Sequence, residues 1–404
     1  MSLSVNRRRV IKGMGASLGV LALRGFEVHA QDLVHFTHGV ASGDPLSDRV
    51  ILWTRALPGS GSHSTVIARW QVAADPSFDN IISSGTATTS SNTDYTCKVD
   101  ATGLPANGSF FYRFIVDGKS SPIGQTKTLP TGMVEQYKIG VASCSNYPQG
   151  YFNAYKHMAE SDLDLVLHLG DYIYEYAQGR YANKVALEQL GRNVEPTTEI
   201  LSLEDYRMRY GLYRTDPDLM ALHQRHPFIC VWDDHELTNN TWKEGAENHN
   251  EGEGDFHQRI RAARQAYHEW LPIRTGAQGD QAPIFRSFQI GDLADLHMLD
   301  TRLHGRDRGL EYGKDLSYQS LIFSNQEEGA AKIIADDQGK LSEAAGGQRV
   351  LVPFDMTGDE PVAITDYTTI AGLTEQTLPD GWSYLPDASR FRKEKLDNPQ
   401  RTIL

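Results

Sequence analysis

The sequence has few cysteines, a deficit of cations and no long apolar segment. Its three cysteines, Cys97, Cys144 and Cys230, are an odd number and allow at most one disulfide. Beyond the N-terminus no run approaches the roughly 20 apolar residues that a bilayer-spanning helix needs, so no transmembrane segment is expected. The 39 Lys and Arg residues are outnumbered by 52 Asp and Glu, which gives a net charge of −13. This excess of acid argues against nucleic acid or an anionic membrane as a standing partner.

The N-terminus departs from this acidic balance and has the layout of an export signal. Asn6–Lys12 contains paired arginines followed by two apolar residues and a lysine, which resembles a twin-arginine signal. A short apolar stretch, Gly13–Leu23, and the small-x-small pattern Val28–Ala30 come next. We therefore expect a twin-arginine signal peptide over residues 1–30, which the twin-arginine export machinery recognises, and a periplasmic, cell-surface or secreted protein. The alternative is a basic start that contains arginines by chance.

Residues 33–130 show the pattern of an all-β domain. Short alternating apolar runs recur between turn clusters that are rich in Gly, Pro, Asp and Asn; the runs are Val50–Thr54, Val66–Val72, Tyr95–Val99 and Phe110–Val116. Strands at this spacing predict a β-sandwich of about 100 residues. Thr128–Gly132 has the composition of a linker that closes this domain.

From residue 137 the pattern changes to strands that alternate with helices, which indicates a second domain over residues 137–404. A strand at Lys138–Ser143, a helix at Tyr151–Glu160 and a strand at Leu163–Gly170 form a βαβ unit, so the two strands are expected to be parallel. Residues 325–380 carry weaker signals and are interpreted as a long insertion. The other expected elements are helices at Ser202–Gly211, Asp216–His223 and Phe256–Trp270, a strand at Phe228–Trp232, and a hairpin of Ile284–Ile290 with Leu293–Leu299.

Each of the three expected strands is followed by residues that bind metals. Cys144 follows the first strand, Asp171 and Tyr174 follow the second, and the stretch Asp233–Glu236 follows the third. Ligands of α/β proteins collect at the carboxyl ends of parallel strands, so these side chains are expected to meet in one crevice. An Asp after a strand is, by itself, more often a turn or helix-capping residue. Three such positions in one chain favour a metal site.

The residue types indicate which metals such a site would hold. The Asp171 carboxylate can bridge two cations, and a Tyr174 phenolate is a hard donor suited to a ferric ion. A thiolate from Cys144 would add negative charge. Asp234 and Asn239 offer the hard ligands that suit Ca²⁺ or Mg²⁺.

Attack on phosphorus is the chemistry that this set of ligands predicts. The metals would polarise the phosphoryl oxygens, generate a hydroxide nucleophile and neutralise developing charge. His235 could protonate the leaving group or hold the phosphate. Other histidines have simpler interpretations, because His168 lies within an apolar strand and His38 belongs to the β-domain. We treat both as structural.

Several short motifs occur in order along the chain. They are the twin-arginine start, Phe36–Pro45, Ile51–Arg55, Ala142–Cys144, Gly170–Glu175, Trp232–Glu236 with Asn239–Asn240, and Leu299–Arg302. Together they resemble the alkaline phosphatase D (PhoD-like) family of exported metallophosphatases. The likeness covers the chain from Val34 to about Arg302 and resumes at Arg401–Leu404.

The resemblance implies a fold, an activity and a set of ligands. The implied fold is an α/β (α+β) calcineurin-like metallophosphoesterase sandwich, preceded by an all-β fibronectin- or immunoglobulin-like domain. The implied activity is hydrolysis of phosphate monoesters or diesters, in small molecules or phospholipids, with Fe³⁺ and Ca²⁺. The implied roles are iron binding by Cys144 and Tyr174, bridging by Asp171, metal binding by Asp234, calcium binding by Asn239 (or Asn240), catalysis by His235 and contact with the phosphate by Arg302.

The sequence departs from the family pattern toward its C-terminal end. After the stretch that Arg401–Leu404 matches, family members carry further strands with Gly-Asp-x-His and other histidine motifs that complete the metal site. No Gly-Asp-x-His occurs after residue 300, so we expect a C-terminally truncated member with an incomplete phosphatase domain. The alternatives to an exported phosphatase are therefore a non-catalytic metal- or ligand-binding exported protein and a phospholipase D-like phosphodiesterase.

Overall fold

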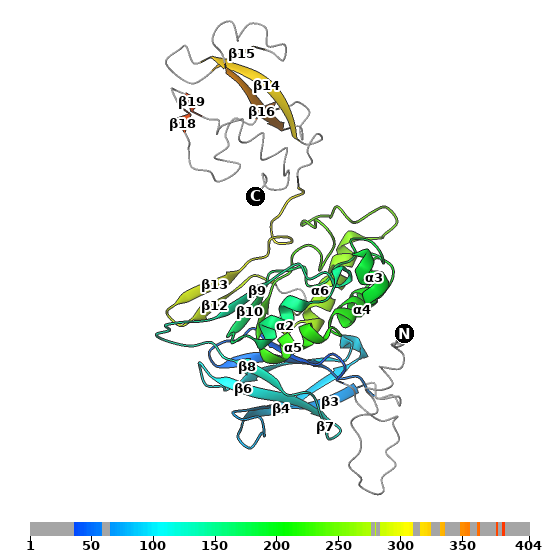
Figure 1. Ribbon diagram of the computed structural model, residues 1–404, viewed down its shortest axis with the longest axis vertical. Coiled ribbons are helices and arrows are strands. Elements are labelled where there is room, and N and C mark those ends of the chain that lie inside the picture. Colours follow the sequence, from blue (N-terminus) through cyan, green and yellow to red (C-terminus); the bar gives the residue numbers. More distant parts are fainter. Residues whose placement is uncertain are drawn as a thin grey trace, which may run out of the picture. The chain divides into compact units, whose positions relative to one another are not determined.

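The computed structural model divides into two compact units, Met1–Arg306 and Asp307–Leu404. It describes residues 36–58, 65–275, 279 and 283–309 in full, and it describes the backbone of several strands between residues 316 and 383. The elements that surround the candidate site lie in the first unit, where Figure 1 shows the N-terminal strands in blue and cyan and the helices in green.

The N-terminal part of the first unit consists of short β-strands. They are β1 (Val40–Gly43), β2 (Arg49–Arg55), β3 (Thr65–Ala73), β4 (Ile81–Ser90), β5 (Thr96–Thr102), β6 (Ser109–Val116), β7 (Lys119–Ser120) and β8 (Gly124–Lys127). Five of them form an antiparallel sheet in the order β4-β3-β6-β7, with β8 also paired to β6. Side chains along β3 and β6 alternate between buried and more exposed positions, as expected for a sheet with one covered face.

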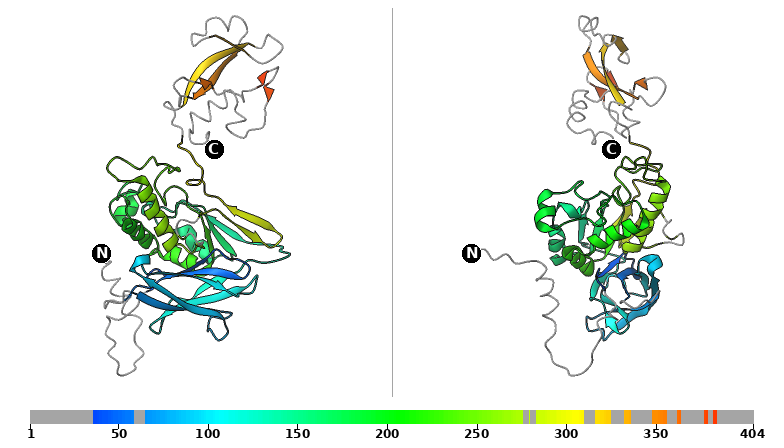
Figure 2. Two further views of the ribbon diagram at one scale, coloured as in Figure 1. Left: turned by 180° about the vertical axis from the view of Figure 1, so that it is seen from behind. Right: turned by 90° about the vertical axis from the view of Figure 1, so that its right-hand side faces the viewer.

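Strands β1, β2 and β5 belong to a second sheet, and the two sheets face each other in the N-terminal region (Figure 2). Apolar side chains from both sheets fill the space between them, among them Val40 and Leu52 on one side and Phe110 and Phe114 on the other. The β-sandwich expected from the alternating runs is therefore present.

The second part of the first unit alternates strands and helices. Its elements are β9 (Ile139–Ala142), α2 (Asn153–Glu160), β10 (Leu165–His168), α3 (Lys184–Leu190), α4 (Leu203–Tyr213), α5 (Pro217–Arg225), β11 (Phe228–Cys230), α6 (Phe256–Trp270), β12 (Arg286–Ile290) and β13 (Ala294–Met298). Strands β9, β10 and β11 are parallel neighbours, as the βαβ pattern predicts. Strands β12 and β13 form the expected antiparallel hairpin.

Strands of the two parts join in one continuous sheet. Its order is β5-β2-β1-β11-β10-β9, and β1 pairs with β11 in parallel where Gly43 lies beside Phe228. A Cβ atom at Gly43 would lie 2.3 Å from the carbonyl oxygen of Pro272 and 2.6 Å from that of Phe228, so only glycine permits this approach. The sequence analysis treated the two regions as separate and did not anticipate the shared sheet.

Local signals account for where the helices begin. In α4 the Ser202 hydroxyl accepts a hydrogen bond from the Asp205 N–H, while the Asp205 carboxylate accepts one from the Ser202 N–H, which forms a capping box. Pro217 lies in the first turn of α5, where its missing N–H costs nothing. The Asp255 carboxylate caps α6 by accepting from the Gln258 N–H at 2.7 Å.

The second unit contains strands that the sequence analysis did not predict. They are β14 (Leu316–Ser324), β15 (Lys332–Ala335), β16 (Gln348–Asp355), β17 (Val362–Ala363), β18 (Thr377–Leu378) and β19 (Trp382–Ser383). The first four form an antiparallel sheet in the order β15-β14-β16-β17, and β18 pairs with β19. Strands β15, β16 and β17 fall within residues 325–380, where the sequence signals were weak, and the interpretation of this stretch as a long insertion stays a prediction.

Candidate metal centre

The chain turns sharply where β9 and β10 end. Cys144 and Asp171 have φ values of 57° and 55°, in the left-handed region that residues with a Cβ atom rarely adopt. Gly170 has a φ of 107°, and a Cβ atom there would lie 2.3 Å from the backbone nitrogen of Asp233. Strained backbone of this kind is concentrated at functional sites, where the surrounding structure holds it in place.

These turns and the end of β11 bring Asp171, Asp234 and His235 together. Each offers one ligand atom, the three atoms lie within 4.8 Å of one another, and all three residues are buried. Two carboxylates and an imidazole are a donor set that suits hard and borderline metal ions. The residues present therefore fit a metal ion, at the strand edge where the sequence predicted one.

Tyr174 and Cys144 lie next to the Asp171 carboxylate. The Tyr174 hydroxyl donates to Asp171 Oδ2 at 3.2 Å, whereas the Cys144 sulfur lies outside the group of three. Burial raises the pKa of Asp171. Burial, together with the negative charge of Asp171, also raises the pKa of Tyr174. Without a cation nearby, Tyr174 is thus a neutral phenol.

His235 is held by a buried acid, Glu175. The imidazole Nδ1 lies 2.7 Å from Glu175 Oε2, and the glutamate is fully buried. Burial opposes the charged imidazolium, but the hydrogen bond and the charge of Glu175 outweigh it and raise the pKa of His235 to about 9. Because Nδ1 is engaged, Nε2 is the nitrogen that remains for a substrate or a metal.

Glu175 also organises the loop that follows His235. One carboxylate oxygen, Oε1, accepts hydrogen bonds from the backbone N–H of Asn239 and from the side-chain amide of Asn248, both at 2.8 Å. The sequence analysis included Glu175 in a motif but assigned it no role. The only sequence signal was an acid at the end of the Gly170–Glu175 stretch, and its histidine partner is 60 residues away.

Glu236 is a second acid whose role the sequence analysis missed. Its buried carboxylate accepts hydrogen bonds from the backbone N–H groups of Asp171, Tyr172 and Asp233, at 3.0, 2.5 and 2.9 Å. Burial, reinforced by the charge of Asp171, raises the pKa of Glu236 to about 8. Glu236 thus ties the turn after β10 to the turn after β11 and holds Asp171 close to Asp234.

Arg302 brings a cation to this acidic group. Its guanidinium forms ion pairs with Asp233 at 2.5 Å and with Asp234 at 3.2 Å. The third nitrogen, Nη1, is buried and has no hydrogen-bond partner among the described residues. It is therefore available for an anionic oxygen.

The structure does not direct the Asn239 side chain at the ligand group. Its amide nitrogen lies 3.5 Å from Glu247 Oε2, at the edge of hydrogen-bonding distance, and the Asn240 amide contacts the same oxygen. The contact with the group comes instead from the backbone N–H of Asn240, which donates to Asp234 Oδ2 at 2.5 Å. The choice between Asn239 and Asn240 as a calcium ligand stays a prediction.

Three tyrosines surround His235. The ring of Tyr174 lies 4.2 Å from the imidazole, and the rings of Tyr176 and Tyr181 lie 5.5 and 6.3 Å from it. His168 is fully buried and hydrogen-bonds to the Tyr155 hydroxyl at 3.0 Å, consistent with the structural interpretation of this residue.

Two carboxylates and an imidazole at the carboxyl ends of the parallel strands β10 and β11, with the Arg302 guanidinium beside them, define an α/β protein with a candidate metal site. Residues 139–341 match the family model described as PhoD-like phosphatase, and residues 24–130 match the one described as PhoD-like phosphatase, N-terminal domain. The chain therefore belongs to the PhoD-like phosphatase family. The predicted family and fold class, a mixed α/β domain that follows a β-rich N-terminal region, are confirmed.

Individual relatives agree with this assignment. The chain is 40% identical over 322 residues to alkaline phosphatase D of Bacillus subtilis (strain 168), a match that covers 75% of this chain and 54% of the relative. A solved structure described as that of PhoD matches with a TM-score of 0.63 and 38% identity, over 74% of this chain and 56% of the other. The chain thus spans about half the length of these relatives. No helix in the described part of the chain is long and apolar enough to cross a membrane.

Proposed function

We propose that this chain is an exported, metal-dependent phosphatase that hydrolyses phosphate monoesters, diesters or both. The observation that carries the proposal is the convergence of two potential metal ligands, Asp171 and Asp234, with the His235 imidazole and Nη1 of Arg302. Cations and a guanidinium nitrogen next to each other are what a phosphoryl group needs from a protein site. Membership of the PhoD-like family supports the same reaction class.

Iron and calcium are the ions that we propose for the site. Cys144 and Tyr174 would hold Fe³⁺, and Asp171 would bridge to a Ca²⁺ that Asp234 and Asn239 bind. The contact of the Tyr174 hydroxyl with Asp171, and the position of Cys144 at the end of the neighbouring strand β9, support a shared ion at that place. When bound, the ions would supply Lewis-acid activation and neutralise the charge of the phosphate.

Arg302 and His235 are the residues that we propose to contact the substrate. Arg302 Nη1 would donate to a phosphate oxygen, while Asp233 and Asp234 hold the other guanidinium nitrogens in place. His235 would give the proton on Nε2 to the leaving-group oxygen. Glu175 keeps Nδ1 engaged and raises the pKa of His235, which favours the protonated imidazole that such a transfer needs.

The domain limits and the cellular location also remain proposals. We propose a twin-arginine signal peptide over residues 1–30, an N-terminal β-domain over 33–130 and a phosphatase domain over 137–404. The substrates would be phosphate esters of small molecules or phospholipids. The paired arginines near the start of the chain support passage through the twin-arginine machinery.

Hydrolysis of 4-nitrophenyl phosphate and of bis(4-nitrophenyl) phosphate, with Fe³⁺ and Ca²⁺ supplied, tests the proposal. Asp171→Ala is expected to lower the rate at least about 100-fold, since it removes the central carboxylate. Asp295→Ala, at an exposed acid of β13, is the matched control and should leave the rate unchanged. Equal rates for wild type and Asp171→Ala would reject the proposal. Bound iron without turnover would favour the non-catalytic metal-binding alternative.

A further inference from the structure

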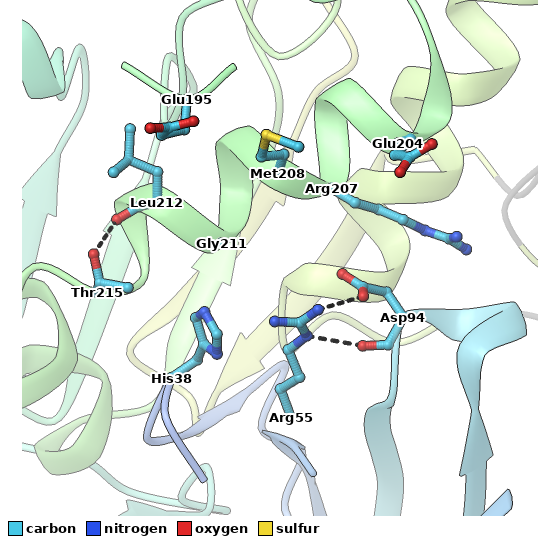
Figure 3. A pocket seen from close by; sticks show the side chains of 10 residues that line it. All are labelled: His38, Arg55, Asp94, Glu195, Glu204, Arg207, Met208, Gly211, Leu212 and Thr215. Carbon is cyan, nitrogen blue, oxygen red and sulfur yellow. Dashed lines mark hydrogen bonds and ion pairs between the residues drawn. The ribbon is translucent and has the colours of Figure 1, made fainter. Parts of the chain in front are cut away.

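A cavity separate from the metal centre lies between the N-terminal strands and helix α4. Its volume is about 530 Å³. Figure 3 shows its lining, with α4 on one side and the N-terminal strands on the other; the lining residues used below are His38, Arg55, Glu195, Glu204, Met208 and Gly211. Cavities where two parts of a protein meet are frequent sites for small ligands.

His38 presents an unpartnered nitrogen to this cavity. The residue is only 7% exposed, and its Nδ1 is engaged with the Thr37 hydroxyl at 2.9 Å. Its Nε2 has no hydrogen-bond partner among the described residues. Burial, with the nearby charge of Arg55, lowers the pKa of His38 to about 3, so the imidazole is neutral. When the Thr37 hydroxyl donates to Nδ1, Nε2 carries the proton and offers a hydrogen-bond donor.

Arg55 offers a second donor on the same side of the cavity. Its Nε donates to the Asp94 carbonyl at 2.9 Å and its Nη2 pairs with the Asp94 carboxylate. The guanidinium also lies over the Trp270 ring, but the remaining nitrogen, Nη1, has no hydrogen-bond partner in the described ranges, and in Figure 3 it lies on the His38 side. One ligand group can therefore accept hydrogen bonds from both Arg55 and His38.

Gly211 keeps the space beside His38 open. A Cβ atom at this position of α4 would lie 3.3 Å from the Trp270 ring and 3.7 Å from His38 Nε2. Any larger side chain would cover the nitrogen that faces the cavity. Met208, on the same helix, adds an apolar wall next to this opening.

Unpaired carboxylates line the outer part of the cavity. Glu195 and Glu204 are exposed and form no ion pair among the described residues. The Arg207 guanidinium, which also lines the cavity, is already held by Glu269 at 2.6 and 2.7 Å. The free carboxylates repel phosphates and other polyanions and attract an ammonium group.

We propose that this cavity binds a small zwitterion, an amino acid that carries one carboxylate and one ammonium group. The carboxylate accepts hydrogen bonds from Arg55 Nη1 and His38 Nε2. The ammonium lies in the outer part of the cavity, where Glu195 and Glu204 at opposite ends of the lining make the potential negative, and the methylene groups pack against Met208. This site is independent of the phosphatase proposal, since none of its residues belongs to the metal centre.

Calorimetric titration of the full chain tests this site. The probes are the ω-amino acids from glycine to 6-aminohexanoate, with hexanoate and hexylamine as ligands that carry one charge each. We expect saturable binding of at least one ω-amino acid, at least about tenfold tighter than binding of hexanoate or hexylamine. Arg55→Gln should weaken that binding about 10- to 100-fold, because a charge-assisted hydrogen bond is lost. Arg69→Gln, at an exposed arginine of β3, is the matched control and should bind like wild type.

A second variant separates the two ends of the ligand. Glu195→Gln with Glu204→Gln changes exposed residues, so it should fold even if Arg55→Gln does not. It should weaken binding of the ω-amino acid about three- to tenfold and leave binding of hexanoate unchanged or stronger. The proposal is overturned if no probe binds or if hexanoate binds as tightly as the ω-amino acids. It is also overturned if the variant with both Glu195→Gln and Glu204→Gln binds the ω-amino acid as tightly as wild type does.

Discussion

Replacement of Glu175 by glutamine removes the charge that holds His235 and leaves the shape of the side chain. Glutamine still offers an oxygen to the Asn239 N–H and to the Asn248 amide, so the loop contacts can persist. The charged imidazole, however, loses its buried partner at 2.7 Å. In the variant, burial lowers the pKa of His235 while only the charges of Asp234 and Asp171 still raise it, so this pKa should fall well below 9.

The size of the effect follows from that shift. A folded-state pKa of about 9 against 6.5 in the unfolded chain means that the protonated imidazole stabilises the native state. The contribution is complete below pH 6.5, amounts to about 2.5 kcal/mol at pH 7, and is lost as the pH rises through 9. Glu175→Gln should therefore lower the free energy of unfolding by up to about 2.5 kcal/mol at pH 7 and by much less at pH 10.

Urea unfolding of metal-free protein, in the presence of a chelator at pH 6, 7, 8 and 10, measures this difference. The control is the same substitution in a His235→Asn background. Position 235 then carries no imidazole, so the effect of Glu175→Gln should not change with pH. Equal destabilisation at pH 6 and pH 10 in the wild-type background would refute the reasoning, since it would show that His235 is not charged by Glu175.

Three further substitutions test the packing that positions the site, and thermal or urea unfolding measures each of them. Gly170→Ala should destabilise the protein by at least about 2 kcal/mol, because the new Cβ meets the Asp233 backbone in a positive-φ conformation; wild-type stability would contradict this geometry. Arg286→Met should cost about 3–5 kcal/mol, because it leaves the fully buried Asp44 carboxylate without its bidentate partner; a loss below about 1 kcal/mol would show that Asp44 does not depend on Arg286. Ser202→Ala should cost about 1 kcal/mol through the loss of the α4 cap, whereas Ser287→Ala, on the exposed hairpin, should cost less; equal losses would count against the cap.

Elements with purely local causes were predictable from the sequence. The helix Phe256–Trp270 was predicted with the bounds that the structure shows, because an Asp cap precedes it and its apolar residues recur at helical spacing. The parallel strands β9, β10 and β11 were predicted because short apolar runs that alternate with helical segments are typical of buried parallel strands. Asp171 and Asp234 were candidates for the same reason, since each follows such a strand.

Contacts between distant residues were not predictable in the same way. The pairing of β1 with β11 at Gly43 and Phe228 depends on which strand backbones can approach each other in the folded protein. The periodicity of apolar residues predicts that a strand forms but does not say which strand it pairs with. The strands β14 and β16 of the second unit were missed although each is a run without glycine, because the interpretation of this region rested on the Gly- and Asp-rich sequence between and after them.

The sequence by itself thus determined the family, the acids that follow strands and the signals at helix ends, because each of these depends on residues that are close together in the sequence. The tertiary structure alone decided which of those acids meet. In the folded protein Glu175 contacts His235, and the Asn239 amide lies toward Glu247. Glu236 accepts hydrogen bonds from both the turn after β10 and the turn after β11. The physical reason is that hydrogen-bond partners and pKa values depend on burial and on distances across the fold, which only packing sets.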